Sequence, residues 1–330
     1  MQILPGVHQI PCIYHDRPLN LYLLIYGNES LLMDTGDATV PPNDILPYFQ
    51  KINFNPKNLT YVLLTHPDLD HTGGIYEIQA AAPQAQFLCG TQDAEQIQTP
   101  EALGRIRARA HYYWHNLGPD DAKLATYIQK AGGPGKKITF AKTFSGGESL
   151  HLGYRTVEIL HLPGHSMGHL GVFLPWENAA IIGDAVHGTA NRFLTGQAAF
   201  ACTYMYIDAY LGTIDRLQAM RLDKLFSCHW PNCTTNDQVN AFLNESRNYC
   251  LHAEAAILET LLAAGPNGLT LKDICTLAKP KLGDWPPEKD SETRSMALGH
   301  LQHLCQLGLA TATPDRPTRY LPVPQWLGLK

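Results

Sequence analysis

The chain has 330 residues, 45% of them hydrophobic and 17% charged, and its formal net charge is −5 at pH 7. This composition is typical of a globular protein, and the longest apolar runs fall far short of the roughly 20 residues that a membrane-spanning helix needs. A net negative charge also disfavours sequence-independent binding to nucleic acid, which needs a basic surface. We therefore expect a small-molecule partner.

The first residues and the cysteines bear on the compartment. Met1 to Pro11 lacks a basic stretch followed by a continuous apolar segment, which argues against secretion, and we expect a cytoplasmic location. The eight cysteines include no CxxC pair and are interpreted as buried thiols.

The predicted elements begin with strands. The segments "LYLLIY" and "SLLMDTG" predict a hairpin around Gly27 and Asn28. "LTYVLLTH" (59–66) is typical of a buried strand, and "GGIYEIQAAAP" (73–83) predicts a helix that Pro83 ends.

Residues 93–135 are rich in helix formers and aromatic side chains, so we expect a helical insertion. Its aromatic group either packs in a core or forms a lid over a site, and a lid would favour a substrate with an apolar acyl or aryl part. The group consists of Tyr112, Tyr113, Trp114 and Tyr127.

Strands then alternate with a helix over 207–220, and the pattern changes near residue 246. Three helical patterns and a short strand pair follow, which resembles a small winged-helix-like module. We therefore expect a catalytic domain over 1–245 and a C-terminal domain over 246–330.

Four predicted strands are each followed by a side chain of the metal-binding type. These are His66, His165, Asp184 and His229. Because the carboxyl ends of strands in an α/β sheet open onto one edge, the four side chains are expected to meet there. The loop "THPDLDHTGG" (65–74) adds Asp68, Asp70 and His71, enough for two neighbouring metal sites.

These motifs resemble those of the metallo-β-lactamase-fold hydrolases, whose hallmark is His-x-His-x-Asp-His. The resemblance covers roughly residues 1–245, in the order "MDTG", "THPDLDHTGG", "LPGHSMGHLGVF", "IIGDAV" and "SCHW". It implies an α/β fold, a four-layer αββα sandwich. It also implies a ligand set: one metal on His66, Asp68 and His165, a second on Asp70, His71 and His229, with Asp184 bridging them and Asp34 supporting the ligands from behind.

Asp68 departs from the family pattern, because a histidine is usual there. The resemblance favours zinc, but a carboxylate oxygen tilts the preference toward iron or manganese. Flavodiiron proteins are similar in having a carboxylate at this position.

Two further histidines are less clearly placed. His169 is interpreted as packing behind the ligands rather than binding metal. His187 follows Asp184 by three residues, where acyl-homoserine lactonases of this fold place a tyrosine, and it is either a loop histidine or a group that bonds the substrate oxygen or shuttles a proton. Seven other histidines match no ligand position and are expected to be structural or exposed, namely His8, His15, His111, His115, His252, His300 and His303. Three tyrosines either line the cavity or pack in the core, namely Tyr204, Tyr206 and Tyr210.

A dinuclear centre with a bridging hydroxide predicts hydrolysis of an ester, lactone or thioester, with Asp70 and Asp184 orienting the nucleophile. The alternatives are a phosphodiesterase or endoribonuclease of the same fold, a di-iron oxidoreductase, and a sensor that turns over little. The acidic net charge argues against the nuclease. Flavodiiron proteins also carry a flavodoxin-like domain, and we find no sequence for one here, which argues against the di-iron oxidoreductase. A homodimer is expected only from the general frequency of two-fold assemblies.

Overall fold

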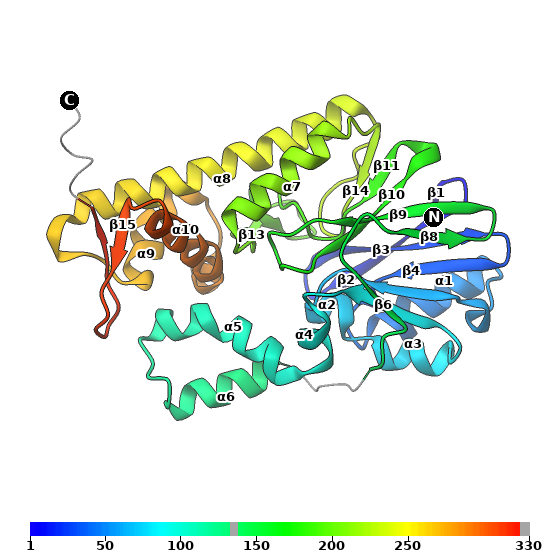
Figure 1. The fold of residues 1–330 in the computed structure, drawn as a ribbon, viewed down its shortest axis with the longest axis horizontal. Coiled ribbons are helices and arrows are strands. Elements are labelled where there is room, and N and C mark those ends of the chain that lie inside the picture. Colours follow the sequence, from blue (N-terminus) through cyan, green and yellow to red (C-terminus); the bar gives the residue numbers. More distant parts are fainter. Residues whose placement is uncertain (133–137, 324–330) are drawn as a thin grey trace.

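The computed structural model describes residues 1–132 and 138–323, in which two β-sheets lie face to face (Figure 1). The first sheet has seven strands in chain order, antiparallel from β1 to β4 and parallel from β4 to β7. The predicted hairpin around Gly27 and Asn28 is confirmed, because Tyr26 pairs with Glu29. The strands are β1 (Gln2–Leu4), β2 (Val7–Tyr14), β3 (Arg17–Tyr26), β4 (Glu29–Met33), β5 (Tyr61–Leu64), β6 (Gln86–Gly90) and β7 (Lys142–Phe144).

The second sheet has five strands in the order β14-β11-β10-β9-β8. Since β10 runs antiparallel to both β9 and β11, and β14 runs parallel to β11, the strands β9, β11 and β14 all point the same way. Their carboxyl ends therefore lie at one edge of the sheet. The strands are β8 (Ser149–Leu152), β9 (Arg155–His161), β10 (Leu170–Leu174), β11 (Ala179–Ile181) and β14 (Lys224–Phe226), and a separate pair consists of β12 (Asn191–Arg192) and β13 (Ala198–Phe200).

Along the strands, side chains that point into the core alternate with side chains that point to solvent, and the inward ones of both sheets pack together. In β9, for example, Val157 and Ile159 are buried and Glu158 between them is exposed, as the two-residue period of a strand requires. One core cluster fills the space between the sheets and reaches the helices α1 (Leu46–Lys51) and α3 (Ile75–Ala81). The helices α7 (Ile207–Ala219) and α8 (Asn236–Ala264) cover the second sheet, so the predicted αββα order of layers is confirmed (Figure 1).

Short helical turns connect several of these elements. They are α2 (Leu69–Thr72), η1 (Pro41–Ile45), η2 (Pro56–Asn58), η3 (Pro175–Glu177), η4 (Gly265–Asn267) and η5 (Pro287–Thr293).

The predicted helical insertion lies between β6 and β7, although positions 133–135 of it fall outside the described residues. Its helices α5 and α6 approach closely at Gly104, where an added Cβ would lie 2.0 Å from the carbonyl oxygen of Ile128. Helix α5 also contacts α9 and α10 of the C-terminal region (Figure 1). The insertion consists of α4 (Ala94–Gln98), α5 (Pro100–His115) and α6 (Ala122–Ala131).

The three C-terminal helices and the terminal hairpin are also confirmed. Helix α8 is followed by α9 (Leu271–Leu282), α10 (Arg294–Gln306) and the antiparallel pair β15 (Ala310–Ala312) and β16 (Tyr320–Pro322). Helix α8 runs without a break through residues 245 and 246, and one core cluster continues from the second sheet into α9 and α10. No helix end marks the expected boundary, so the division into two domains stays a prediction.

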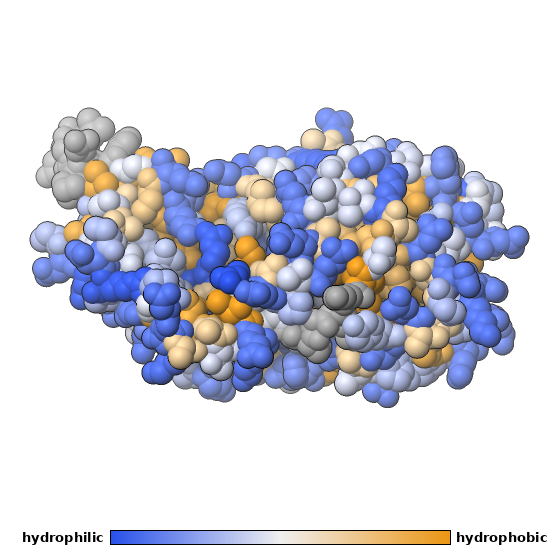
Figure 2. Space-filling view, turned by 60° about the horizontal axis from the view of Figure 1, so that its bottom comes forward, coloured by the Kyte–Doolittle hydropathy of each residue, from blue (hydrophilic) through white to orange (hydrophobic). Residues whose placement is uncertain are grey.

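The helices of the described residues are all too short or too polar to span a membrane. On the face drawn in Figure 2, hydrophobic residues form small patches among hydrophilic ones.

Candidate metal centre

The predicted ligands meet at the edge of the sandwich where strands β5, β9, β11 and β14 end. His66, His165, Asp184 and His229 each follow the last residue of one of these strands within four positions. The convergence follows from the topology, because β9, β11 and β14 are parallel to one another and β5 reaches the same edge from the facing sheet.

A first group consists of His66, Asp68 and His165. Asp68 Oδ2 lies 3.1 Å from His165 Nε2 and 3.7 Å from His66 Nε2. The three side chains come from two loops almost one hundred positions apart, and their ligand atoms lie within 4.8 Å of one another, close enough to hold one cation.

A second group consists of Asp70, His71 and His229, with Asp70 and His71 on the single turn of α2. His229 Nε2 lies 3.4 Å from Asp70 Oδ2. Asp184 Oδ2 lies 3.5 Å from His71 Nε2 and 3.2 Å from His229 Nε2.

The two groups adjoin, since the rings of His66 and His71 are 4.0 Å apart and ligand atoms of both lie within 4.8 Å of a carboxylate oxygen of Asp184. The structure therefore brings together all seven side chains that the sequence predicts as ligands.

The donor atoms of this centre suit divalent cations. His66, His71 and His229 all have a buried Nε2 atom with no hydrogen-bond partner in the described part of the chain, and Asp184 Oδ1 is in the same state. An unsatisfied buried polar atom costs about 1–3 kcal/mol, so four of them in one place indicate a missing partner. Nitrogen and carboxylate donors at this spacing are those that zinc, iron and manganese take.

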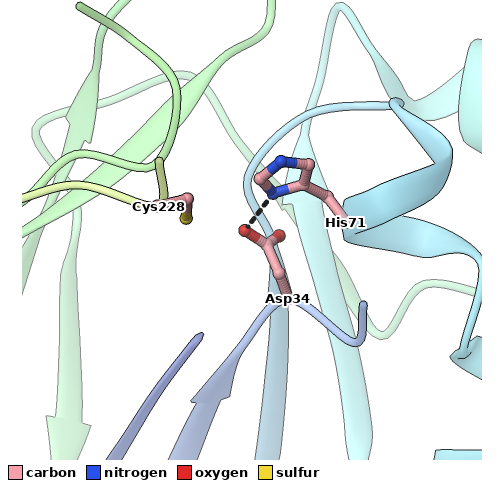
Figure 3. Close-up of side chains that lie close together, drawn as sticks. All are labelled: Asp34, His71 and Cys228. Carbon is pink, nitrogen blue, oxygen red and sulfur yellow. Dashed lines mark hydrogen bonds and ion pairs between the residues drawn. The ribbon is translucent and has the colours of Figure 1, made fainter. Parts of the chain in front are cut away.

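In His71 and His229, the ring nitrogen that faces away from the centre, Nδ1, forms a hydrogen bond with another part of the protein. Asp34 Oδ2 accepts a hydrogen bond from His71 Nδ1 at 2.8 Å (Figure 3). The Asp34 carboxylate also accepts hydrogen bonds from the amide and hydroxyl of Thr65. His229 Nδ1 donates to the carbonyl oxygen of Pro18 at 2.6 Å. Such bonds fix the tautomer and leave Nε2 to face the centre.

Cys228 lies beside Asp34 and His71 (Figure 3). Burial raises the pKa of its thiol to about 12, which keeps it protonated. The Asp34 oxygens are already occupied by three donors, so this trio supports His71 and is a poor site for a separate ion.

The carboxylates give the centre a negative potential. Burial alone would lower the pKa of His229, but Asp184 and Asp70 together raise it to about 9. Burial likewise opposes ionisation of Asp184, yet His229 and His71 hold its pKa well below the usual range. The arrangement favours positive charge at its middle, as a cation site requires.

Sequence reasoning missed Arg107. This residue lies on α5 of the insertion, and its Nη2 donates to Asp68 Oδ1 at 2.8 Å. Burial raises the pKa of Asp68, but Arg107, the hydrogen bond from His165 and the nearby His66 outweigh it and hold the pKa well below normal. No local signal marks Arg107, because only the packing of the insertion brings it to the centre.

Asp93 was missed as well. It is fully buried, and it accepts hydrogen bonds from Ser166 Oγ at 2.5 Å and from the amide of Gly168 at 2.9 Å. These bonds hold the loop that carries His165. Asp93 follows the end of β6 at the same edge of the sandwich, so the strand-end argument would have found it.

His169 and His187 lie behind the ligands. His169 Nε2 accepts a hydrogen bond from the amide of Asp184 at 3.2 Å, and the ring stacks on that of His66. His187 is fully buried, with its Nδ1 3.3 Å from the hydroxyl of Thr203, and it does not line the cavity above the centre. A direct role for His187 in proton transfer stays a prediction.

The centre lies at the floor of a cavity of about 530 Å³. Of the seven aromatic residues that the sequence offered for its wall, Tyr127 and Tyr206 line it. Tyr204 and Tyr210 are fully buried and stack on each other at 4.2 Å. The other three pack elsewhere in the helical layers, namely Tyr112, Tyr113 and Trp114.

Comparison with known proteins agrees with this geometry. The family model described as the metallo-beta-lactamase superfamily matches residues 16–229. A hydroxyacylglutathione hydrolase of Dechloromonas aromatica is 23% identical over 74% of this chain and 69% of its own length. An atrochrysone carboxyl ACP thioesterase of Aspergillus terreus is 25% identical over 54% of this chain, and the match spans only 42% of that protein.

Among solved structures, a metallo-beta-lactamase family protein from Thermus thermophilus superimposes with a TM-score of 0.70 at 20% identity. That superposition covers 98% of this chain and all of the other, so it includes the insertion and the C-terminal helices. The matched family and the shared fold lead to one conclusion: the chain belongs to the metallo-beta-lactamase superfamily.

Proposed function

We propose that the protein is a metal-dependent hydrolase that uses two divalent cations to cleave a thioester, with an ester or lactone as the next candidates. The observation that carries this proposal is the convergence of seven ligand-type side chains, with bare Nε2 and carboxylate oxygen atoms, at the floor of a cavity large enough for a substrate.

In this proposal His66, Asp68 and His165 would hold one cation, and Asp184 would be available to both cations. The second cation takes Asp70, His71 and His229. When bound, the two cations would polarise the carbonyl, lower the pKa of water and stabilise the charge of the leaving group. Zinc is the first expectation, and Asp68 keeps iron and manganese open.

The chain's own groups would orient the reactants. Asp184 lines the cavity, and its Oδ1 has no partner within the described residues, so it can accept a hydrogen bond from the attacking water. Asp70 also lines the cavity beside His229 and can act in the same way. Leu103, Ile106 and Phe200 form an apolar wall that suits an acyl or aryl group and keeps bulk water away.

The relatives support a thioester over other bonds. By their names, the hydroxyacylglutathione hydrolase and the ACP thioesterase both act on acyl groups carried by a thiol.

The test is a panel of thioesters, p-nitrophenyl esters, lactones and bis-p-nitrophenyl phosphate, assayed with protein whose metal content has been measured. We expect turnover of thioesters that is abolished by chelation and restored by a divalent metal. Asp184→Asn should lower kcat/KM by at least about 100-fold, because it removes a shared ligand, whereas Asp223→Asn, at an exposed carboxylate, should leave it unchanged.

Three outcomes would contradict the proposal. Turnover of the phosphodiester alone would indicate a nuclease. Binding of metal without hydrolysis of any substrate in the panel would indicate a sensor. Iron that consumes oxygen without hydrolysis would indicate an oxidoreductase.

A further inference from the structure

Four basic side chains line the cavity, and they come from three separate parts of the chain. Arg17 begins β3, Arg107 and Lys130 belong to the insertion, and Arg294 begins α10 in the C-terminal region. The wall of the cavity therefore includes the insertion and the C-terminal region as well as the first sheet.

Two of these cations are already engaged by the metal centre. Arg107 donates to Asp68 at 2.8 Å. Arg17 lies 3.9 Å from Asp70 and stacks on the ring of Phe200. Their charge is balanced by carboxylates that the proposed metals would also use.

The other two cations, Arg294 and Lys130, have donor atoms that no hydrogen bond from the described residues occupies. The side chain of Arg294 is 15% exposed, and its Nε is buried without a hydrogen-bond partner in the described part of the chain. Its Nη1 donates to the carbonyl oxygen of Ser291 and its Nη2 to the hydroxyl of Tyr127, and its one acidic partner among the described residues is Glu292, which lies 3.9 Å away with a 44% exposed side chain. Lys130 is exposed and has no ion-pair partner among the described residues.

The net charge of the cavity also favours an anionic substrate. Its four basic side chains face four carboxylates, of which three, on Asp68, Asp70 and Asp184, belong to the metal centre. Two divalent cations would add about +4, which leaves the loaded cavity strongly positive. A neutral substrate would form no ion pair with these positive charges.

We propose that Arg294 and Lys130 form a subsite for an anionic group, so that the substrate is a thioester whose thiol arm ends in an anion such as a carboxylate. This inference rests on the proposed hydrolysis of a thioester. It assigns a role to the insertion and to the C-terminal helices, which supply the cations that select the substrate.

The experiment compares two butyryl thioesters that differ chiefly in charge. One has the neutral N-acetylcysteamine arm, and the other has the 3-mercaptopropionate arm, which ends in a carboxylate. We expect kcat/KM to favour the anionic thioester about tenfold or more, through a lower KM, and the preference to shrink as salt screens the charges.

The variants locate the effect. Arg294→Gln and Lys130→Gln should each raise KM for the anionic thioester and reduce the preference to below about threefold, with the neutral thioester unaffected. Arg294→Lys should retain part of the preference. Arg105→Gln and Lys123→Gln, at exposed cations on the insertion helices α5 and α6, serve as controls that should change neither substrate.

A second measurement keeps this inference separable from the proposed function. Uncleavable thioether analogues of the 3-mercaptopropionate arm, with a free carboxylate or its amide, are titrated calorimetrically into the metal-loaded protein. We expect the carboxylate to bind about fivefold more tightly or better, and the Arg294→Gln/Lys130→Gln double variant to lose this difference. Failure of turnover with intact binding would reject the thioesterase proposal alone. Equal binding of both analogues, or a preference that survives the double variant, would reject the anionic subsite.

Discussion

At the scale of single residues, the centre depends on groups that hold the ligands from behind. Asp34 is the clearest of these, because it fixes His71 through Nδ1 and is itself fixed by Thr65. Its φ of 63° is unusual for a residue with a side chain, and this local conformation is maintained by the surrounding bonds. The position immediately after β4 allows the carboxylate to reach across to α2.

Asp34→Asn should weaken metal binding, because the amide is a poorer acceptor for the imidazole Nδ1–H and carries no charge. We expect an affinity for zinc that is lower by about 10- to 100-fold, the usual effect of losing such a supporting partner. Competition with a chromophoric chelator measures this affinity. Asp37→Asn, three positions along at a half-buried residue whose carboxylate accepts hydrogen bonds from Thr39, is the matched control, and equal affinities in the two variants would contradict the role of Asp34.

At the scale of elements, the insertion is tied to the metal centre by Arg107 and Asp68. Helix α5 packs on α6 and α10, but its one charged bond into the centre comes from this pair among the described residues. The departure from histidine at position 68 thus coincides with a cation on a neighbouring element. A carboxylate there can serve the metal and the insertion at once.

Removal of this bond should loosen the insertion. In Arg107→Met we expect amide hydrogen exchange across α5 to accelerate about tenfold, because the helix loses a partly buried, charge-assisted bond of roughly 1.5–3 kcal/mol and the bond from Nη1 to the carbonyl oxygen of Ala131, while α3 keeps all its contacts. Mass-spectrometric hydrogen exchange of the two helices makes the comparison within one sample. Unchanged exchange in α5 would show that packing alone holds the insertion.

At the scale of the whole molecule, the C-terminal helices are joined to the sandwich by one continuous core. His300 on α10 is fully buried in it, where it accepts a hydrogen bond from the hydroxyl of Tyr204 at 3.2 Å and lies 3.4 Å from Glu254. Burial lowers the pKa of His300 despite the neighbouring carboxylate. The folded protein therefore keeps this imidazole neutral.

This burial predicts a loss of stability in mild acid. Below a pH of about 6.5 the unfolded chain binds a proton at His300 that the folded chain rejects, so the free energy of unfolding falls as pH falls, by up to about 1.4 kcal/mol per pH unit from this group. Urea unfolding at a pH of about 6.5 and of about 5.5, with chelator present throughout, measures the effect. His300→Gln should reduce the change in the free energy of unfolding between these two pH values by up to about 1 kcal/mol, and His252→Gln, on the surface of α8, should leave it unchanged. The same pH dependence in all three proteins would refute the explanation.

Much of the fold and the centre could be predicted from the sequence. Strand patterns end at or near His66, His165, Asp184 and His229, and parallel strands place their ends at one edge, so local patterns and a general rule of topology were sufficient for the convergence. The helical insertion and the C-terminal helices were likewise predictable from periodicity.

The tertiary structure alone decided which of the remaining side chains face the cavity. Arg107, Lys130 and Arg294 lie on helices whose patterns are ordinary, and nothing in the local sequence distinguishes the first two from Arg105 or Lys123 on the same elements. Tyr127 and Tyr206 reach the cavity, whereas Tyr204, two positions from Tyr206, is buried. The physical reason is that metal ligands follow from where strands end, while the wall above them follows from how separate helices pack together, and packing depends on contacts between residues far apart in the chain.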